Sequence, residues 1–396
     1  MAEPENKSEE AVDEFPDVLE SENCTYVKEE KMGEGYFGKV FHYKTQDTSQ
    51  DVAVKFMCRR AASKELKILK KIKCLDPDEN CLVRVLEHFG YKSQICVLFE
   101  KLDQTISSLV IIRKKPFEVC ELRPVAQQLM LALRALKTMG IVHCDIKPDN
   151  IMLVDHQSSP YKVKLIDFGL AQNKSNLTCQ SQIQILGYRA PEVVFGCPLD
   201  EGVDMWSVGC VLASLYRGKH FYLNNCLYDY IASIVHMQGQ PPDSILETGV
   251  HVNQFFNTKR KSKGSKYTFK LPSEFIYSLS DLPCRKVTDD YFEHSVTMDD
   301  LLQKRHRGKN LDEDKSDLEE FKSLIKQMAM VAQVVEQVGQ LSKDRRFDPL
   351  WLHWRVDVYE CPGDGQRGRR RKLAATPLLA CPRTVVATVV AYHHQV

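Results

Sequence analysis

The sequence has no uninterrupted run of about 18 apolar residues, the length at which a helix can cross a bilayer. No apolar segment opens the chain, so there is no sign of a secretory signal. The 14 cysteines form no CxxC pair and no regular spacing, a pattern that favours reduced thiols inside a cell. With a net formal charge of +1, charge gives no argument for binding nucleic acid or a membrane. We therefore expect a protein of the nucleus, the cytoplasm or both that is not secreted.

The rest of the composition is that of a globular protein. Of the 396 residues, 43% are hydrophobic and 27% are charged, which suits one large domain or two medium ones. The first 22 residues differ, because they hold nine acids, one lysine and few large apolar side chains. Residues 1–22 are therefore predicted to be a disordered acidic tail.

The sequence pattern changes along the chain. Residues 24–100 read as short strands around one helix, with strands at 39–45 and 51–57 and a turn between them. From about residue 120 the pattern is helical, and residues 121–140 have apolar side chains at helical spacing. We predict a two-lobed α+β fold, with a small β-rich lobe at 26–100 and a larger helical lobe at 104–355. Residues 257–270 and 303–317 are predicted to be exposed loops, and residues 357–396 a disordered tail.

The stretch "GEGYFGKV" spaces three glycines as G-x-G-x-x-G, at Gly33, Gly35 and Gly38. Glycines let backbone N–H groups come close to phosphates, although the same pattern also suits an ordinary tight hairpin turn. The dinucleotide-binding version needs a helix after the glycines. Here a strand-like run follows, which favours a hairpin that covers nucleotide phosphates.

Lys55 ends the apolar stretch "VAVK", where it could extend to solvent or contact a phosphate. The basic helix predicted at 59–72 contains a single acid, Glu65, which shares the apolar stripe of Ile68, Leu69 and Ile72. A carboxylate on a buried face needs a cation, and Lys55 is the natural partner. The alternative is a solvated Glu65 at the edge of the helix.

The stretch "HCDIKPDN" (143–150) places four ionisable side chains at alternate positions. Asp145 can accept a proton from a hydroxyl, and Lys147 can neutralise charge on a transferred phosphoryl group. Asn150 lies five residues after Asp145, and Asp167 in "LIDFGLA" lies 22 residues after it, at the end of a predicted strand. An amide oxygen and a carboxylate that converge there would suit Mg²⁺.

Two further motifs follow in order, "YRAPE" (188–192) and "DMWSVG" (204–209). With this series the chain resembles the eukaryotic protein kinases over roughly residues 26–328. "DIKPDN" resembles the Ser/Thr form, and "YRAPE" resembles the group of cyclin-dependent, MAP and dual-specificity kinases. Within that group, "ELKILKKI", "CVLFEKLDQTI" and "LKTMGIVHCDIKPDNIMLVD" make it similar to the homeodomain-interacting protein kinases.

The resemblance implies a site for ATP and Mg²⁺. Its nucleotide-binding residues would be Gly33, Glu34, Gly35, Gly38, Val40, Ala53, Lys55, Phe99, Glu100, Leu102, Asp103 and Leu153. Phe99 would be the gatekeeper, residues 100–102 the hinge, and Asp103 would lie near the ribose. The resemblance also implies that the substrates are proteins, including transcription regulators. It further implies self-phosphorylation with dual specificity, and a monomeric protein. The alternative is a pseudokinase scaffold that binds ATP without efficient transfer.

The chain departs from the resemblance around its activation segment. Cys144 stands where most kinases have an arginine that grips a loop phosphate, and Gln182 stands where the family has a self-phosphorylated tyrosine. We therefore expect activity to be insensitive to phosphates at Thr178 or Ser181. The segment "SQIQIL" would instead be held by burial of Ile183, Ile185 and Leu186. Cys144 is expected to be a small packing residue rather than a reactive thiol.

The chain departs again towards its C-terminal end. The family pairs the Glu of "APE", here Glu192, with an arginine about eight residues after Met328, but that position is Glu336. Arg345 or Arg346 could supply the missing cation. The run "RGRRRK" (367–372) is either a nuclear-import patch or a solvated charge run.

Overall fold

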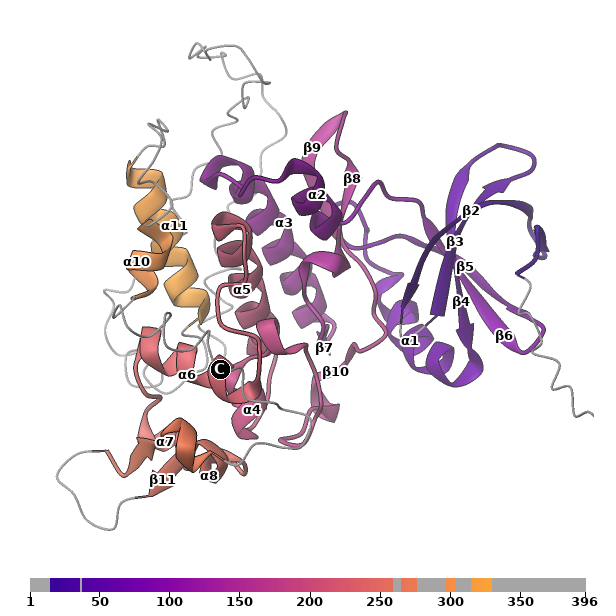
Figure 1. Cartoon of the computed structure of the whole chain (residues 1–396). Coiled ribbons are helices and arrows are strands. Elements are labelled where there is room, and N and C mark those ends of the chain that lie inside the picture. Colours follow the sequence, from indigo (N-terminus) through magenta and orange to yellow (C-terminus); the bar gives the residue numbers. More distant parts are fainter. Residues whose placement is uncertain (1–14, 36–37, 259–264, 276–296, 304–314, 330–396) are drawn as a thin grey trace, which may run out of the picture. The chain divides into compact units, whose positions relative to one another are not determined.

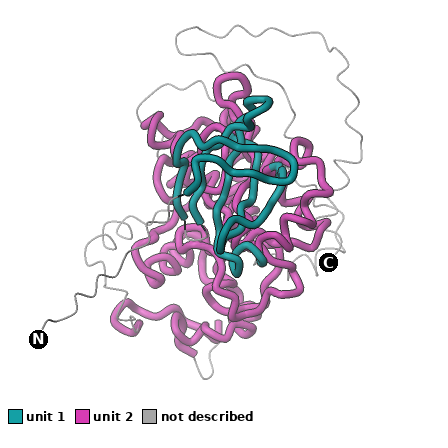
Figure 2. The backbone as a smooth tube through the Cα atoms, turned by 90° about the vertical axis from the view of Figure 1, so that its right-hand side faces the viewer, with its two compact units in different colours: residues 1–64, 84–102 teal, residues 65–83, 103–396 magenta. Residues whose placement is uncertain are grey.

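The chain forms two compact units, shown in teal and magenta in Figure 2. Unit 1 comprises residues 1–64 and 84–102, and unit 2 comprises residues 65–83 and 103–396. Unit 1 is rich in strands and unit 2 in helices, which confirms the predicted two-lobed α+β fold. The computed structural model describes residues 15–35, 38–258, 265–275, 297–303 and 315–329.

Unit 1 is built on a six-stranded antiparallel sheet with the order β1-β2-β3-β4-β6-β5. The strands are β1 (Val18–Glu20), β2 (Thr25–Gly35), β3 (Gly38–Thr45), β4 (Asp51–Cys58), β5 (Val85–Tyr91) and β6 (Gln94–Glu100). β3 and β4 confirm the strands predicted at 39–45 and 51–57, with the turn between them. Their β-branched and aromatic residues suit a pleated surface.

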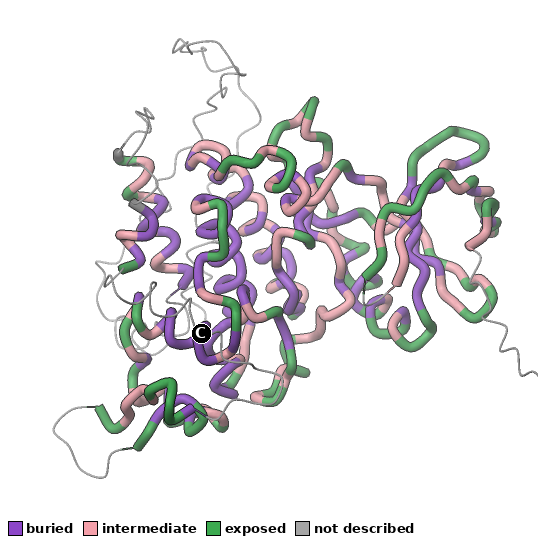
Figure 3. The backbone as a smooth tube through the Cα atoms, viewed as in Figure 1, coloured by how far each residue is buried: buried purple, intermediate pink, exposed green. Residues whose placement is uncertain are grey.

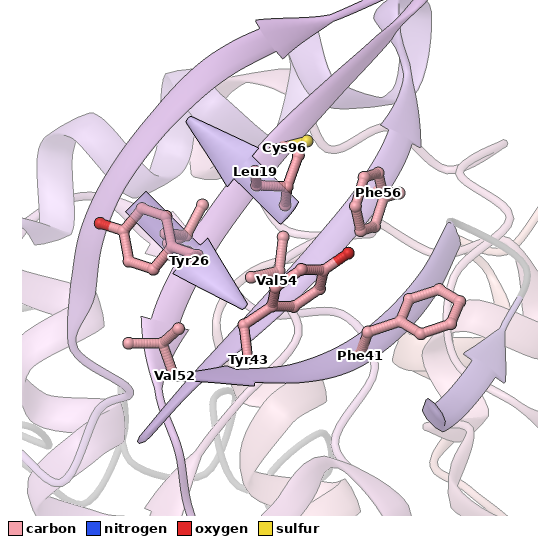
Figure 4. Packing of buried hydrophobic residues seen from close by; sticks show 9 residues of the cluster. Leu19, Tyr26, Phe41, Tyr43, Val52, Val54, Phe56 and Cys96 are labelled. Atoms are coloured by element: carbon pink, nitrogen blue, oxygen red, sulfur yellow. The ribbon is translucent and has the colours of Figure 1, made fainter. Parts of the chain in front are cut away.

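The two faces of β4 have different roles, because side chains alternate along a strand. Val52, Val54 and Phe56 are buried in a cluster with Tyr43 and other apolar side chains (Figure 4). Ala53 and Lys55 therefore face the opposite side of the sheet. The face of the sheet that carries Ala53 and Lys55 therefore does not belong to this apolar cluster.

The N-terminal prediction needs a correction. Residues 1–14 lie outside the described residues, but Val18–Glu20 forms β1, and Leu19 is buried. The ring of Phe15 lies 4.7 Å from that of Phe41, and the hydroxyl of Tyr43 donates to the carbonyl of Pro16. The predicted disordered tail therefore extends too far, because two apolar contacts and one hydrogen bond hold residues 15–20 in place despite the acidic composition of this stretch.

Helix α1 (Arg59–Ile72) begins in unit 1 and ends in unit 2. Glu65, Ile68, Leu69 and Ile72 are all buried, which confirms the predicted inward stripe. The lysines of its last turn, Lys70 and Lys71, are exposed. Positive charge at this end suits the helix dipole.

Unit 2 contains the remaining elements (Figure 1). Its other helices are α2 (Ile106–Arg113), α3 (Val119–Thr138), α4 (Pro191–Phe195), α5 (Gly202–Arg217), α6 (Leu227–Gln238), α7 (Asp243–Leu246), α8 (Val252–Phe255), α10 (Met298–Gln303) and α11 (Lys315–Ala329). Its strands are β7 (Ile141–Val142), β8 (Ile151–Asp155), β9 (Ser159–Leu165), β10 (Gln172–Asn173), β11 (Phe256–Thr258) and β12 (Tyr267–Phe269). Short 3₁₀ turns are η1 (Pro148–Asn150), η2 (Lys174–Asn176), η3 (Leu186–Tyr188) and η4 (Pro272–Glu274).

Helix α5 is the core helix of unit 2. Every residue from Gly202 to Tyr216 is buried, and Figure 3 shows the helix almost entirely in purple. A helix that is buried all round packs against neighbours on every side, here including α3, α10 and α11. A Cβ on Gly209 would lie 2.9 Å from the Cβ of Met328, so this glycine allows α11 to approach closely.

Other predicted segments are partly described. The helix predicted at 121–140 is confirmed as α3. The predicted loop 257–270 includes part of β11 and all of β12, which pair with each other, so the loop prediction is wrong at its ends. Residues 259–264, 304–314 and 330–396 lie outside the described residues, with the predicted C-terminal tail. Among the helices that are described, none combines the length and apolar character needed to cross a bilayer.

Candidate active site

The loop His143–Asn150 connects β7 to β8, and the buried side chain of Asp204 on α5 holds its backbone by hydrogen bonds. The backbone N–H groups of His143 and Cys144 donate to its two carboxylate oxygens, at 2.6 and 2.9 Å. Burial raises the pKa of Asp204, and its hydrogen bonds with the loop oppose that change. One carboxylate on a core helix thus fixes the start of the loop.

His143 links this loop to the segment after β9. Its Nε2 donates to the carbonyl oxygen of Ile166 at 3.0 Å, and its Nδ1 accepts from the N–H of Asp145 at 3.3 Å. This assignment places the ring hydrogen on Nε2. The ring also contacts that of Phe168, edge to face at 5.0 Å. His143 is therefore a positioning residue for both Asp145 and the "DFG" segment.

Asp145 is buried and its two carboxylate oxygens differ. Oδ2 accepts from the Nζ of Lys147 at 2.8 Å and from the Nδ2 of Asn150 at 2.8 Å. Oδ1 has no hydrogen-bond partner among the described residues. A buried acceptor that lacks a partner costs free energy, so its presence points to a ligand that donates to it. The structure thus brings together the three predicted residues and leaves one oxygen for a hydroxyl.

The β8–β9 hairpin brings the two predicted metal ligands to one end. Ile151 pairs with Leu165, and the N–H of Ile166 donates to the carbonyl of Asn150 at 3.0 Å. Asn150 therefore precedes one strand and Asp167 follows the other, at the same edge. Because the Nδ2 of Asn150 is bonded to Asp145, its Oδ1 remains as an oxygen ligand. An amide oxygen and a carboxylate fit Mg²⁺, which uses few protein ligands together with phosphates.

Asp167 and Cys144 both have left-handed backbone conformations, with φ of 58° and 67°. Such conformations are costly for residues other than glycine and often occur at functional sites. Cys144 is fully buried, and burial raises the pKa of its thiol far above the usual range. This agrees with the predicted packing role. No group of three or more His, Cys, Asp or Glu that could hold a metal occurs in the described part of the chain.

The activation segment is held differently from the prediction. Ile183 is buried and Leu186 is half-buried, but Ile185 is 44% exposed. The prediction that Ile185 anchors the segment is therefore wrong. Gln184 adopts φ of 62°, which breaks the alternation that would put Ile183 and Ile185 on one face.

Gln184 is the polar anchor that replaces Ile185. Its N–H donates to the carbonyl of Cys144 at 2.9 Å, and its Nε2 donates to Val203 and Ser207 on α5 at 2.6 and 2.8 Å. Its Oε1 accepts from the N–H of Ala190 at 3.0 Å, and its carbonyl accepts from Arg189 at 2.7 Å. One glutamine thus joins the catalytic loop, the activation segment and α5.

Glu192 of "YRAPE" lies on α4 and is 8% exposed. Its Oε2 has no hydrogen-bond partner among the described residues, and burial raises the pKa of the carboxyl to about 7. The proposed partners Arg345 and Arg346 lie outside the described residues, as does Glu336.

In unit 1, four predicted nucleotide-binding residues share one face of the sheet. Val40 pairs with Lys55, and Ala53 pairs with Phe99, so their side chains lie on the face opposite the core. Lys55 is 8% exposed, which is low for a lysine outside an ion pair or a ligand site. This face therefore carries three apolar side chains and one lysine, which suits the base and the phosphates of a nucleotide.

The glycine stretch forms the β2–β3 hairpin, as predicted, with Gly33 paired to Val40 and Gly35 to Gly38. A Cβ on Gly38 would lie 2.0 Å from the carbonyl oxygen of Phe56, so only glycine fits there. A Cβ on Gly33 or Gly35 would meet nothing within 4 Å. Glu34 pairs with Lys31 at 2.7 Å, and this hydrogen bond lowers the pKa of Glu34.

The hinge residues divide between the units. In unit 1, Glu100 accepts from the N–H of Arg84 at 2.6 Å, and Leu102 is buried. In unit 2, the N–H of Asp103 donates to the carbonyl of Leu153 at 3.0 Å, which makes these two predicted residues neighbours. Lys55 belongs to unit 1 and Glu65 to unit 2, so their ion pair stays a prediction.

Two important residues had no assigned role in the sequence. Asp204 lies in a motif that the sequence revealed, but its bonds to the catalytic loop span about 60 positions. Gln184 had no sequence signal, because an isolated glutamine in a loop is common.

The comparisons with known proteins show the family to which the chain belongs. A family model for the protein kinase domain matches residues 26–332. The chain is 35% identical over 327 residues, 80% of its length, to homeodomain-interacting protein kinase 2 of Mesocricetus auratus. It is 37% identical over 264 residues, 63% of its length, to homeodomain-interacting protein kinase 1 of Caenorhabditis elegans, and 36% identical over 250 residues, 60% of its length, to homeodomain-interacting protein kinase 4 of Homo sapiens.

The chain spans only part of these relatives. The matched regions cover 28%, 31% and 40% of the three relatives' own lengths. The kinase domain model, in contrast, covers most of this chain, including the candidate site residues of both units. The chain therefore belongs to the protein kinase family.

Proposed function

We propose that this chain transfers the γ-phosphoryl group of ATP to serine and threonine hydroxyls of protein substrates. The observation that carries the proposal is Asp145, whose Oδ1 is buried and has no hydrogen-bond partner among the described residues. Oδ2 is held by Lys147 and Asn150 at 2.8 Å each, so the orientation of the carboxylate is fixed. A fixed carboxylate with one available oxygen is suited to bind a substrate hydroxyl.

These contacts support the following reaction. The substrate hydroxyl donates to Oδ1 of Asp145, and its oxygen attacks the γ-phosphorus of ATP. A new O–P bond forms, the bond to the β-phosphate oxygen breaks with its electron pair on ADP, and the hydroxyl proton passes to Asp145. Lys147, held next to Asp145, neutralises charge on the transferred group. The choice of Ser and Thr rests on Lys147, which resembles the Ser/Thr form of the loop.

The nucleotide would bind on the face of unit 1 that carries Val40, Ala53 and Lys55. Lys55, oriented by Glu65, would bind the phosphates under the glycine hairpin. Asn150 and Asp167 would hold Mg²⁺, which neutralises phosphate charge when bound. Asp103 and Leu153 would contact the ribose and the base.

The wider role is proposed from resemblance. The names of the relatives describe proteins that interact with homeodomains, and we propose transcription regulators among the substrates of this chain. We also propose that it acts as a monomer in the nucleus and the cytoplasm, with self-phosphorylation of either specificity.

The experiment measures transfer from radiolabelled ATP to a peptide array. Asp145→Asn should abolish transfer and keep ATP binding, because it removes the base and leaves the nucleotide contacts. Asp149→Asn is the matched control, since it makes the same change in an exposed residue of the same loop. Normal transfer by Asp145→Asn would refute the assignment of the base.

The second candidate is a pseudokinase scaffold, favoured by the altered activation segment with Gln182, Leu186 and Gly187. In that case the parent protein would bind ATP with no transfer to any peptide. ATP binding by the parent and by Asp145→Asn, with no transfer by either protein, would support this reading.

A further inference from the structure

Residues 15–20 form a strap on the sheet of unit 1. They lie before the segment that matches the protein kinase domain, which begins at residue 26. The strap nevertheless belongs to the sheet, because β1 pairs with β2 over all three of its residues and Leu19 is 1% exposed. An added segment that is packed in this way can influence the strands that it covers.

The ring of Phe15 joins the strap to β3 and β4. It lies 4.7 Å from the ring of Phe41 on β3 and 4.9 Å from the ring of Phe56 on β4. The pair with Phe56 is edge to face, an arrangement that aromatic rings favour. Phe41 and Phe56 belong to the buried cluster of Figure 4 and contact each other edge to face at 5.7 Å. Phe15 thus binds both strands at one place.

Polar contacts hold the backbone of the strap as well. The Nζ of Lys28 on β2 donates to the carbonyl of Phe15 at 2.8 Å and pairs with Asp17 at 2.6 Å. The hydroxyl of Tyr43 on β3 donates to the carbonyl of Pro16 at 2.7 Å. The strap therefore contacts three neighbouring strands, β2, β3 and β4.

The other face of β3 and β4 carries two of the proposed nucleotide contacts. Val40 directly precedes Phe41, Lys55 directly precedes Phe56, and Val40 pairs with Lys55 across the two strands. Consecutive side chains of a strand point to opposite faces. Because packed side chains resist displacement, the rings on the core face help to determine where Val40 and Lys55 lie.

Lys39 makes a second connection, from the strap to the glycine hairpin. Its Nζ lies 5.0 Å from the centre of the Phe15 ring, within the range of a cation–π contact. The same Nζ is 3.9 Å from the Oε1 of Glu34, the residue between Gly33 and Gly35. Phe15 therefore restricts the lysine that pairs across this hairpin.

We propose that Phe15 is a positioning residue for ATP binding. Its ring holds β3, β4 and the glycine hairpin in the arrangement that receives the nucleotide, and it acts through Phe41, Phe56 and Lys39. The inference rests on the proposed function, because ATP is the ligand concerned. Loss of the ring leaves a space against β3 and β4, so a smaller fraction of the molecules is ready to bind ATP, and the apparent affinity falls by that fraction.

The test uses the full-length protein. Isothermal titration calorimetry gives the dissociation constant of ATP with Mg²⁺, and the radiolabel assay gives kcat and the KM for ATP, all at a temperature below the lowest Tm. We expect Phe15→Ala to raise the dissociation constant and KM by about three- to tenfold. The kcat at saturating ATP should stay within about twofold of the parent, because bound ATP selects the competent arrangement. A purely structural role would instead lower kcat and leave KM unchanged.

Three further variants make the matched comparison. Phe15→Tyr keeps the ring and should keep the affinity of the parent. Val18→Ala shortens a side chain of the same strap that is 50% exposed, and it should leave the dissociation constant unchanged. Lys39→Met removes the cation and keeps an unbranched side chain, so it should weaken ATP binding by less than Phe15→Ala does. In the double variant, the combined increase should be smaller than the product of the two single increases, because both changes break the same contact.

Equal ATP affinity of the parent and Phe15→Ala would overturn the proposal, as would a lower kcat with an unchanged KM. An equal loss of affinity in Val18→Ala or Phe15→Tyr would also overturn it. If Phe15→Ala does not fold, Lys39→Met decides, and an unchanged dissociation constant in that variant overturns the proposal. A parent that binds ATP without transferring phosphate would refute the proposed function alone, since the dissociation constants can still be compared. A parent that does not bind ATP would overturn both.

Discussion

The buried carboxyl of Glu192 makes the stability of the protein depend on pH. It is 8% exposed, and its Oε2 has no hydrogen-bond partner among the described residues. Burial raises its pKa from 4.5 to about 7. The folded protein therefore holds this proton more tightly than the unfolded chain, so the stabilisation is complete below pH 4.5 and is lost as the pH rises through 7.

The magnitude follows from the two pKa values. Each pKa unit corresponds to about 1.4 kcal/mol, and between pH 5 and pH 8 the linkage amounts to about 2.5 kcal/mol. Glu192→Gln removes the titrating group and keeps its shape. The free energy of unfolding of Glu192→Gln, relative to the parent, should therefore rise by about 2.5 kcal/mol from pH 5 to pH 8. The test uses only the change of this difference with pH. Any effect of the amide on stability that is independent of pH therefore cancels.

The assay is urea-induced unfolding of both proteins at several pH values. Glu247→Gln removes a carboxyl whose side chain is 53% exposed in the same unit and gives the baseline for a surface position. If the difference in the free energy of unfolding between Glu192→Gln and the parent does not change with pH, the reasoning is refuted. A Glu192→Gln protein that becomes less stable than the parent as the pH rises would show that Glu192 is ionised and paired, as Arg345 or Arg346 would make it.

Two further predictions concern the nucleotide site and the activation segment. Lys55→Met should abolish phosphate transfer by removing the phosphate contact, and Glu65→Lys should have the same effect in the radiolabel assay; normal activity of Glu65→Lys would show that the ion pair does not form. Ile183→Ser should lose about 2–4 kcal/mol of local stability and most of the activity, because Ile183 is 3% exposed. Ile185→Ser should change stability by less than about 0.5 kcal/mol, because Ile185 is 44% exposed. Equal effects of the two serine variants, measured by thermal unfolding and initial rates, would contradict the assigned anchor.

The sequence by itself determined the two-lobed α+β class and some of the helices and strands. Apolar spacing revealed α1 and α3, and β-branched runs revealed β3 and β4, because these signals depend on neighbours within a few residues. The spacing of Asp145, Lys147, Asn150 and Asp167 was also visible, since the loop and the β8–β9 hairpin that position them are local. For the same reason, the glycine stretch could be recognised as a hairpin.

Only the tertiary structure decided which residues hold these pieces in place. The alternation of "IQIL" suggested that Ile183 and Ile185 share one buried face, but bonds from Gln184 to Cys144, Val203 and Ser207 hold Gln184 in a left-handed conformation that turns Ile185 outwards. These bonds join positions 19 to 40 residues apart, and no periodicity in one segment can report them. The same applies to Asp204, whose carboxylate fixes the catalytic loop across about 60 residues of chain. A hydrogen bond between distant segments depends on how whole elements pack, so it becomes visible only once the chain has folded.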